Sequence, residues 1–117
     1  MTFGRGDIVM ADIFYSDRTG SKRRPALVVS TDANNAVIDD IVLVGISSST
    51  RRGAFTHVFA DPGTPEGVGS GLLHPSYIQC ENIFTLDKQF VIRSLGHLSP
   101  LLLQQVDDAL KAALELP

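Results

Sequence analysis

Short apolar runs separated by turn residues constrain the fold of this chain more than any other feature of its sequence. The runs are rich in β-branched and aromatic side chains, which is typical of β-strands. Strands are predicted at residues 7–14, 26–29, 41–46, 55–60, 77–80 and 90–93. No apolar run approaches the length of a membrane span, so we expect no membrane association.

The segments between these runs are predicted to be turns and loops. Residues 32–35 have turn composition, and residues 82–87 are expected to join two strands. Residues 61–75 contain so many glycines and prolines that no regular element is expected there. A long loop of this kind is often functional.

The last part of the chain is predicted to be one amphipathic helix. Ser99 supplies a capping hydroxyl and Pro100 occupies the first helical position. Apolar residues then recur at spacings of three and four, at Leu103, Val106, Leu110, Ala113 and Leu114. With a length of 117 residues, the pattern predicts a single domain over residues 1–117, mainly β with a C-terminal helix.

Cysteine and histidine usage argues against a disulfide or a metal centre. Cys80 stands alone in a strand and is expected to be a small buried side chain. His57, His74 and His97 lack the spacing of zinc ligands, although His74 lies in the long loop and could reach a ligand. We therefore expect no metal and no cofactor and, with no leader segment, a cytoplasmic protein.

The basic residues are concentrated, although the chain is acidic overall with a formal net charge of −3. Most cations lie in two short segments that adjoin strands, namely Arg18, Lys22, Arg23, Arg24, Arg51 and Arg52. Clustered cations favour an anion between them, and a guanidinium matches the oxygens of a phosphate. The pattern indicates a phosphate-bearing partner, and a solvated basic turn is the alternative.

Two strand ends carry candidate site residues. Pro25 restricts the backbone beside Arg24 and so sets the direction of this cation. Ser47 and Ser48 follow the apolar run 41–46, where a hydroxyl can donate to a phosphoryl oxygen or can simply end the strand.

A third candidate pair lies in the strand predicted at residues 77–80 and just beyond it. Gln79 and Glu81 share a face of the strand if no bulge intervenes. Glu81 could then orient a guanidinium or act as a base. A purely structural role for the pair is the alternative.

Four segments, in order along the chain, carry a family resemblance: GDIV at 6–9, GSKRRPALVVS at 20–30, FTLDK at 84–88 and LGHLSP at 95–100. Together they resemble the MazF/PemK family of toxins from bacterial type II toxin–antitoxin pairs. The resemblance implies a small SH3-like barrel (CcdB/PemK-like) with a terminal helix. It also implies a homodimer that cuts single-stranded RNA without metal and that a cognate antitoxin protein blocks.

The resemblance assigns roles to the candidate residues by position. Arg24 matches the family's catalytic arginine, and Ser47 falls where the family usually has a catalytic threonine. Gln79 falls where several members have an arginine, and Glu81 where some have an acidic residue near the RNA. The implied products carry 2′,3′-cyclic phosphate and 5′-hydroxyl ends. Arg18, Lys22, Arg23, Ser48, Arg51 and Arg52 are the expected supporting residues for RNA binding.

Two other functions remain open on the sequence. The related CcdB toxins share the fold and inhibit DNA gyrase through the terminal helix. A catalytically weakened RNA-binding homologue is the other alternative, because Gln79 would remove one cation from the site.

Overall fold

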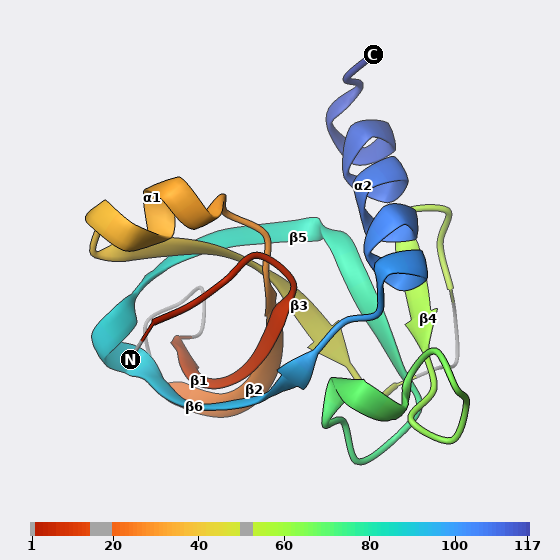
Figure 1. Ribbon diagram of the computed structural model, residues 1–117, viewed down its shortest axis with the longest axis horizontal. Helices are drawn as coiled ribbons and strands as arrows, with labels where there is room; N and C mark the ends of the chain where they lie inside the picture. Colours follow the sequence, from red (N-terminus) through yellow and green to blue (C-terminus); the bar gives the residue numbers. More distant parts are fainter. Residues whose placement is uncertain (1, 15–19, 50–52) are drawn as a thin grey trace.

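The computed structural model describes residues 2–14, 20–49 and 53–117, and these form a six-stranded antiparallel sheet with two α-helices (Figure 1). The strands are β1 (Asp7–Phe14), β2 (Ser21–Val28), β3 (Asp40–Ser47), β4 (His57–Ala60), β5 (Ser76–Asp87) and β6 (Val91–His97). The helices are α1 (Asp32–Val37) and α2 (Pro100–Leu114), with 3₁₀ turns η1 (Val68–Ser70) and η2 (Lys88–Phe90).

The sheet curls into a small barrel-like body but does not close. Its strand order is β4-β5-β3-β2-β1-β6, so β4 and β6 are the two edges. Figure 1 shows β1, β2 and β6 curving on one side of the molecule, with α2 beside β4 and β5 on the other. The predicted fold class, a mainly β, barrel-like protein with a C-terminal helix, is confirmed. Within the described ranges, no helix has both the length and the apolar character needed to cross a membrane.

The β1–β2 hairpin carries the first basic segment on a strand. β2 spans Ser21–Val28, whereas the sequence predicted a strand from residue 26. Lys22, Arg23 and Arg24 all pair with residues of β1. Because side chains alternate along a strand, consecutive residues of this basic segment point to opposite faces of the sheet.

The predicted division of the region after residue 76 is wrong. The sequence predicted a strand at residues 77–80 and a link at 82–87, but one strand, Ser76–Asp87, runs through both. The second half of this strand pairs with β3 from Asp40 to Val44. Polar side chains in this half gave it the composition of a loop, although its backbone completes the sheet.

A bulge interrupts the pairing of β5 with β3. Val44 pairs with Ile83, and the next residue of β3, Gly45, pairs with Gln79. Residues 80–82 therefore have no counterpart on β3. Such a bulge bends the strand and changes the direction of its side chains, so the alternation of the sequence does not carry across it.

The turn predicted at residues 32–35 is the start of a helix, α1. Thr31 caps it, because its hydroxyl accepts a hydrogen bond from the backbone N–H of Asn34 at 3.3 Å. The side chain of Asn35 is buried and donates to the carbonyl of Ser30 at 3.0 Å. The Asn35 side chain thus provides a hydrogen bond to a backbone carbonyl, and the segment forms a helix rather than an open turn.

Alternating strand residues separate two apolar clusters on the two faces of the sheet. On β1, Ile8 belongs to the cluster beneath α2, and Val9 belongs to the cluster inside the curl. The predicted helix starts as expected, because the Ser99 hydroxyl accepts from the N–H of Leu102 at 3.2 Å. Its buried stripe is formed by Leu102, Val106 and Ala109.

The helical stripe predicted from spacing is therefore only partly correct. Val106 is fully buried, whereas Leu103 and Leu110 are partly buried and Leu114 is 53% exposed. The spacing identifies the helix, but its packing against β4 and β5 decides which neighbouring leucine is covered.

The long segment 61–75 is attached to the sheet by close backbone packing. It contains the 3₁₀ turn η1, which the sequence did not predict. Gly71 has a φ of +73°, and a Cβ on it would lie 2.0 Å from the carbonyl oxygen of Leu95. A Cβ on Gly96 of β6 would lie 2.3 Å from the carbonyl oxygen of Gly69. Glycine at both positions lets this segment lie directly against β6.

The remaining strand boundaries differ little from the prediction. The strand predicted at residues 55–60 begins at His57 and leaves Phe55 exposed. The strand predicted at 90–93 begins at Val91 and continues to His97.

Candidate active site

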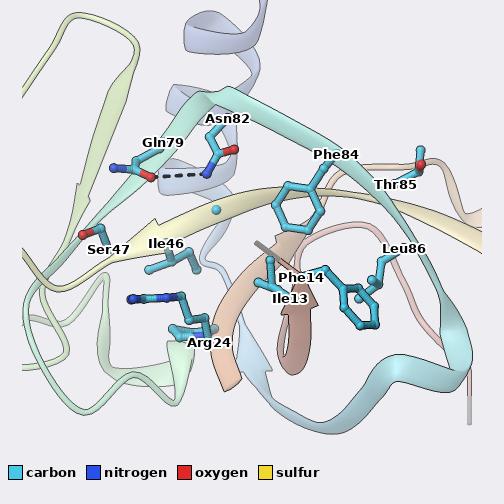
Figure 2. Close-up of a pocket in the computed structure, with 12 residues that line it drawn as sticks. Ile13, Phe14, Arg24, Ile46, Ser47, Gln79, Asn82, Phe84, Thr85 and Leu86 are labelled. Carbon is cyan, nitrogen blue, oxygen red and sulfur yellow. Dashed lines mark hydrogen bonds between the residues drawn. The ribbon is translucent and has the colours of Figure 1, made fainter. Parts of the chain in front are cut away.

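A cleft with a volume of about 660 Å³ lies where β2, β3 and β5 meet. Figure 2 shows most of its polar side chains at one end and most of its apolar side chains at the other. The polar end is lined by Arg24, Ser47, Gln79 and Asn82. The apolar end is lined by Ile13, Phe14, Phe84 and Leu86.

Arg24 is positioned on β2, opposite Ala11 of β1 and directly before Pro25. Its side chain is exposed and forms no ion pair with the residues that the structure describes. The neighbouring Arg23 instead lies 3.7 Å from the carboxylate of Asp12. Arg24 therefore keeps its guanidinium available for an external anion.

The predicted supporting residues next to Arg24 do not line the cleft. Lys22 and Arg23 are exposed on β2, opposite Ile13 and Asp12 of β1. Because they lie on the same strand as Arg24, their positions suit longer-range attraction of a polyanion rather than contact inside the cleft.

Ser47 ends β3 and lies opposite Tyr77 of β5. Its hydroxyl oxygen accepts a hydrogen bond from the backbone N–H of Ser49 at 3.2 Å. This bond leaves the hydroxyl hydrogen free to donate into the cleft. Arg24 and Ser47, predicted from two separate strand ends, thus line one cavity.

A second cavity of about 280 Å³ lies on the other side of Arg24. Arg24, Pro25 and Ile46 line both cavities, so they form the wall between them. The polar residues of the second cavity are Arg24, Ser48, His74, Ser76 and Arg93. Ser48 and His74 were singled out from the sequence. Arg93 was not, because nothing in its strand pattern sets it apart.

Glu81 does not line either cavity. Its carboxylate accepts from the Thr56 hydroxyl at 2.8 Å and lies 3.1 Å from Nε2 of His57. His57 accepts the N–H of Ala54 at Nδ1 at 3.2 Å, so Nε2 carries the proton that it donates to Glu81. The predicted shared face required an unbulged strand, and the bulge at 80–82 breaks that condition.

The surroundings of Glu81 keep it ionised. Burial alone would raise its pKa, but hydrogen bonds from the backbone, Thr56 and His57 outweigh burial and lower the pKa of Glu81 below its ordinary value of 4.5. A carboxylate that already accepts these bonds is a poor general base. These contacts support a structural role for Glu81, which was the alternative to a role as a base.

The surroundings of Cys80 and His97 indicate structural roles. Cys80 is fully buried, as predicted, and burial together with the nearby charge of Glu81 raises the pKa of its thiol to about 11. Nδ1 of His97 lies 2.9 Å from the carboxylate of Asp7. In the part of the chain that the structure describes, no three His, Cys, Asp or Glu side chains are grouped as metal ligands.

Several cleft residues were not found by sequence reasoning. Asn82, Phe84 and Thr85 line the cleft from the half of β5 that was predicted to be a link. Phe14 lines it from the end of β1 and packs edge-on against Phe90, with ring centroids 5.0 Å apart. Arg18, Arg51 and Arg52, which were predicted to support binding, lie outside the described residues.

Comparison with known proteins identifies the family of this chain. A model described as "PemK-like, MazF-like toxin of type II toxin-antitoxin system" matches residues 4–114. The chain belongs to this family. The predicted resemblance is therefore confirmed over nearly the whole sequence.

Curated members of the family are similar along their full length. Endoribonuclease EndoA of Bacillus subtilis (strain 168) is 31% identical over 120 residues, which cover 99% of this chain and 97% of the relative. Endoribonuclease MazF4 of Mycobacterium tuberculosis (strain ATCC 25618 / H37Rv) is 33% identical over 113 residues, which cover 97% of this chain and 93% of the relative.

Solved structures agree with this assignment. An endoribonuclease from a mycobacterial species, in complex with its cognate antitoxin, is 30% identical with a TM-score of 0.80, covering 99% of this chain and 98% of that chain. MazF of a MazE–MazF complex from Deinococcus radiodurans has the same TM-score at 19% identity and covers 100% of both chains, which shows the shared fold.

Proposed function

We propose that this protein is the toxin of a toxin–antitoxin pair and cleaves single-stranded RNA at the cleft that contains Arg24 and Ser47. One observation carries the proposal. An exposed guanidinium without an ion pair among the described residues shares a cleft with a hydroxyl, two amides and two phenylalanine rings. That combination can bind a phosphate at one end and an unpaired base at the other.

The shape of the cleft favours a single strand. Phe14 and Phe84 offer aromatic faces at its apolar end, and a base can stack there only when it is not stacked in a duplex. Arg24 lies between two cavities, so a chain whose phosphate contacts Arg24 has space for a nucleotide on either side.

The proposed reaction uses the RNA as its own nucleophile. The ribose 2′-oxygen attacks the adjacent phosphorus and loses its proton to water, and the bond between phosphorus and the 5′-oxygen breaks. The 5′-oxygen takes up a proton, which gives a 2′,3′-cyclic phosphate and a 5′-hydroxyl. Arg24 would stabilise the charge that builds on the phosphoryl oxygens, and Ser47 would donate a hydrogen bond to one of them.

Arg24 is better suited to charge stabilisation than to proton transfer. A guanidinium does not lose its proton in proteins, so it cannot act as an efficient acid. Its fork of N–H donors matches two phosphoryl oxygens at once, and Pro25 holds the strand that presents it. We therefore propose that the reaction needs no metal ion.

The proposed partners follow from the family and from the surface. The mycobacterial relative was solved with its cognate antitoxin, and we propose that an antitoxin also blocks this cleft. Leu73 is 86% exposed and Phe55 is 84% exposed, so a second copy has apolar surface to cover, and we propose a homodimer. Since its substrate is RNA, we expect the protein to act in the cytoplasm.

A cleavage assay in EDTA tests the function. Purified protein is incubated in EDTA with a long single-stranded RNA and with a duplex of the same sequence. Inhibition of gyrase is measured separately, as supercoiling of relaxed DNA in the presence of Mg²⁺ and ATP. We expect cleavage of the single strand alone, with cyclic phosphate at the new 3′ end. Activity that requires added Mg²⁺, or equal cleavage of the duplex, would contradict the proposed mechanism. Gyrase inhibition without RNA cleavage would instead favour the CcdB-like alternative, although the curated relatives named here are endoribonucleases.

A further inference from the structure

The bulge of β5 lies at the edge of the cleft and determines which side chain enters it. Because residues 80–82 have no partner on β3, the strand bends there and Asn82 joins Gln79 in lining the cleft. Figure 2 shows the two amide side chains linked at the polar end of the cleft. Bulges often redirect a side chain toward a site in this way.

Gly45 makes room for the Asn82 amide. A Cβ built on Gly45 would lie 2.3 Å from Nδ2 of Asn82, which is closer than any real contact. Gly45 is not among the described glycines with positive φ, so its backbone conformation does not require glycine. A side chain at position 45 would therefore force the Asn82 amide out of its place over Gly45.

The bulge is anchored on the side away from β3. The N–H of Cys80 donates to the carbonyl of Thr56 at 3.0 Å, and the hydroxyl of Thr56 donates to Glu81 at 2.8 Å. His57 holds the other carboxylate oxygen of Glu81 at 3.1 Å. These contacts fix the residues on which the position of Asn82 depends.

The amide of Asn82 retains most of its hydrogen-bonding capacity. The residue is exposed, and its partner among the described side chains is Gln79, through a long contact of 3.5 Å from Nδ2 to Oε1. A primary amide has two donors and a two-lone-pair acceptor side by side. Most of these groups have no strong partner among the side chains that the structure describes, and the residue lines the cleft.

We propose that Asn82 is a specificity-determining residue that reads the edge of the base bound in the cleft, and that this base is adenine. An asparagine amide makes two hydrogen bonds with adenine, accepting from its amino group and donating to a ring nitrogen. The phenylalanine rings at the apolar end of the cleft would hold the base in reach. The inference rests on the proposed function, because it assigns a role within the same cleft.

Sequencing the cleavage sites tests the inference. A single-stranded RNA with randomised positions is cut by each variant, and the base preference at each position is read as a ratio within one sample. The wild-type protein should prefer adenine at a position next to the cut. A bidentate contact discriminates between bases by about 5- to 150-fold, and Asn82→Ala should lose that preference.

Two further variants distinguish a loss of base recognition by Asn82 from a general loss of structure. Asn82→Asp has the same shape but only accepts, so it loses the hydrogen bond to the ring nitrogen, and the preference for adenine should fall. Gly45→Ala should reproduce the loss seen with Asn82→Ala, because its methyl group occupies the place of the amide. In an Asn82→Ala background, Gly45→Ala should add no further change in preference. Asn34→Ala, an exposed asparagine on α1, is the matched control.

The outcomes distinguish this inference from the function on which it rests. If the wild-type protein cuts RNA and Asn82→Ala keeps the same base preference, the inference is overturned while the proposed function stands. If the wild-type protein cuts no RNA, both are overturned. An additive effect of Gly45→Ala on preference in the Asn82→Ala background would also contradict the steric argument.

Discussion

Replacing Arg24 with alanine is the most direct test of how the cleft works. Loss of one preorganised donor to a developing oxyanion lowers the rate by about 10²- to 10³-fold, which corresponds to roughly 2.7–4 kcal/mol in the transition state. Arg24 is exposed and has no ion pair within the described ranges, so its removal leaves no buried charge behind. The free energy of unfolding should therefore change by no more than about 0.5 kcal/mol.

The assay is single-turnover cleavage of a fluorogenic single-stranded RNA in EDTA, with the unfolding free energy measured by urea titration on the same samples. Arg24→Lys keeps the charge but loses the planar fork, and it should recover only part of the lost rate. Arg23→Ala is a matched control. It removes an arginine from the adjacent position, where the side chain is paired with Asp12 and lies outside the cleft, and it should lose far less activity.

Two results would refute this reasoning. If Arg24→Ala keeps more than about a tenth of the wild-type rate, Arg24 is not the principal charge-stabilising group. If its loss of rate is matched by a comparable loss of stability, the arginine has a structural role that its exposure does not indicate.

Other substitutions test separate parts of the structure. Ser47→Ala should lower the cleavage rate by about 10- to 150-fold, the worth of one hydrogen bond to a charged oxygen, while Ser47→Thr keeps it; equal rates for all three proteins would remove Ser47 from the mechanism. Gly96→Ala should destabilise the fold by about 1–3 kcal/mol in urea titration, because its methyl group would meet the carbonyl of Gly69 at 2.3 Å, whereas Gly63→Ala, which is less crowded, should not. For Glu81, the lowered pKa gives stability that is present above the ordinary value of 4.5 and is lost as pH falls through the lower folded value. Unfolding measured between pH 6 and pH 3 should thus show a steeper loss for the wild-type protein than for Glu81→Gln, and parallel curves would contradict the assigned contacts.

The sequence predicts well those parts of the fold that local pattern determines. β1 and β3 are rich in β-branched apolar residues, and α2 has both a capping serine and a proline at its start, so their positions follow from short-range rules. Arg24 and Ser47 were found because each adjoins an apolar run. Their meeting in one cleft requires the pairing of β2 with β3, which local pattern does not specify.

The parts that the sequence did not predict depend on tertiary contacts. The sequence of α1 has the composition of a turn, and it does not reveal that Asn35 is buried against Ser30. The second half of β5 looks like a link because a bulge breaks its alternation, and Asn82 could not be placed in the cleft without that bulge. Gln79 and Glu81 were predicted to share a face only if no bulge intervened, and the sequence did not reveal the bulge.

The packing of the 61–75 segment against β6 determines where this chain can change in length. Its composition is that of an ordinary surface loop, which would suggest free tolerance of insertions. Gly71 and Gly96, however, leave no room for an added atom between this segment and β6. Gly67 is similarly close to the backbone of Asp61, whereas residues 63–66 are exposed at the tip. A reporter peptide should therefore be accepted at residues 63–66 and rejected after Gly67. In natural variants, we expect gains and losses of residues to be confined to the same tip.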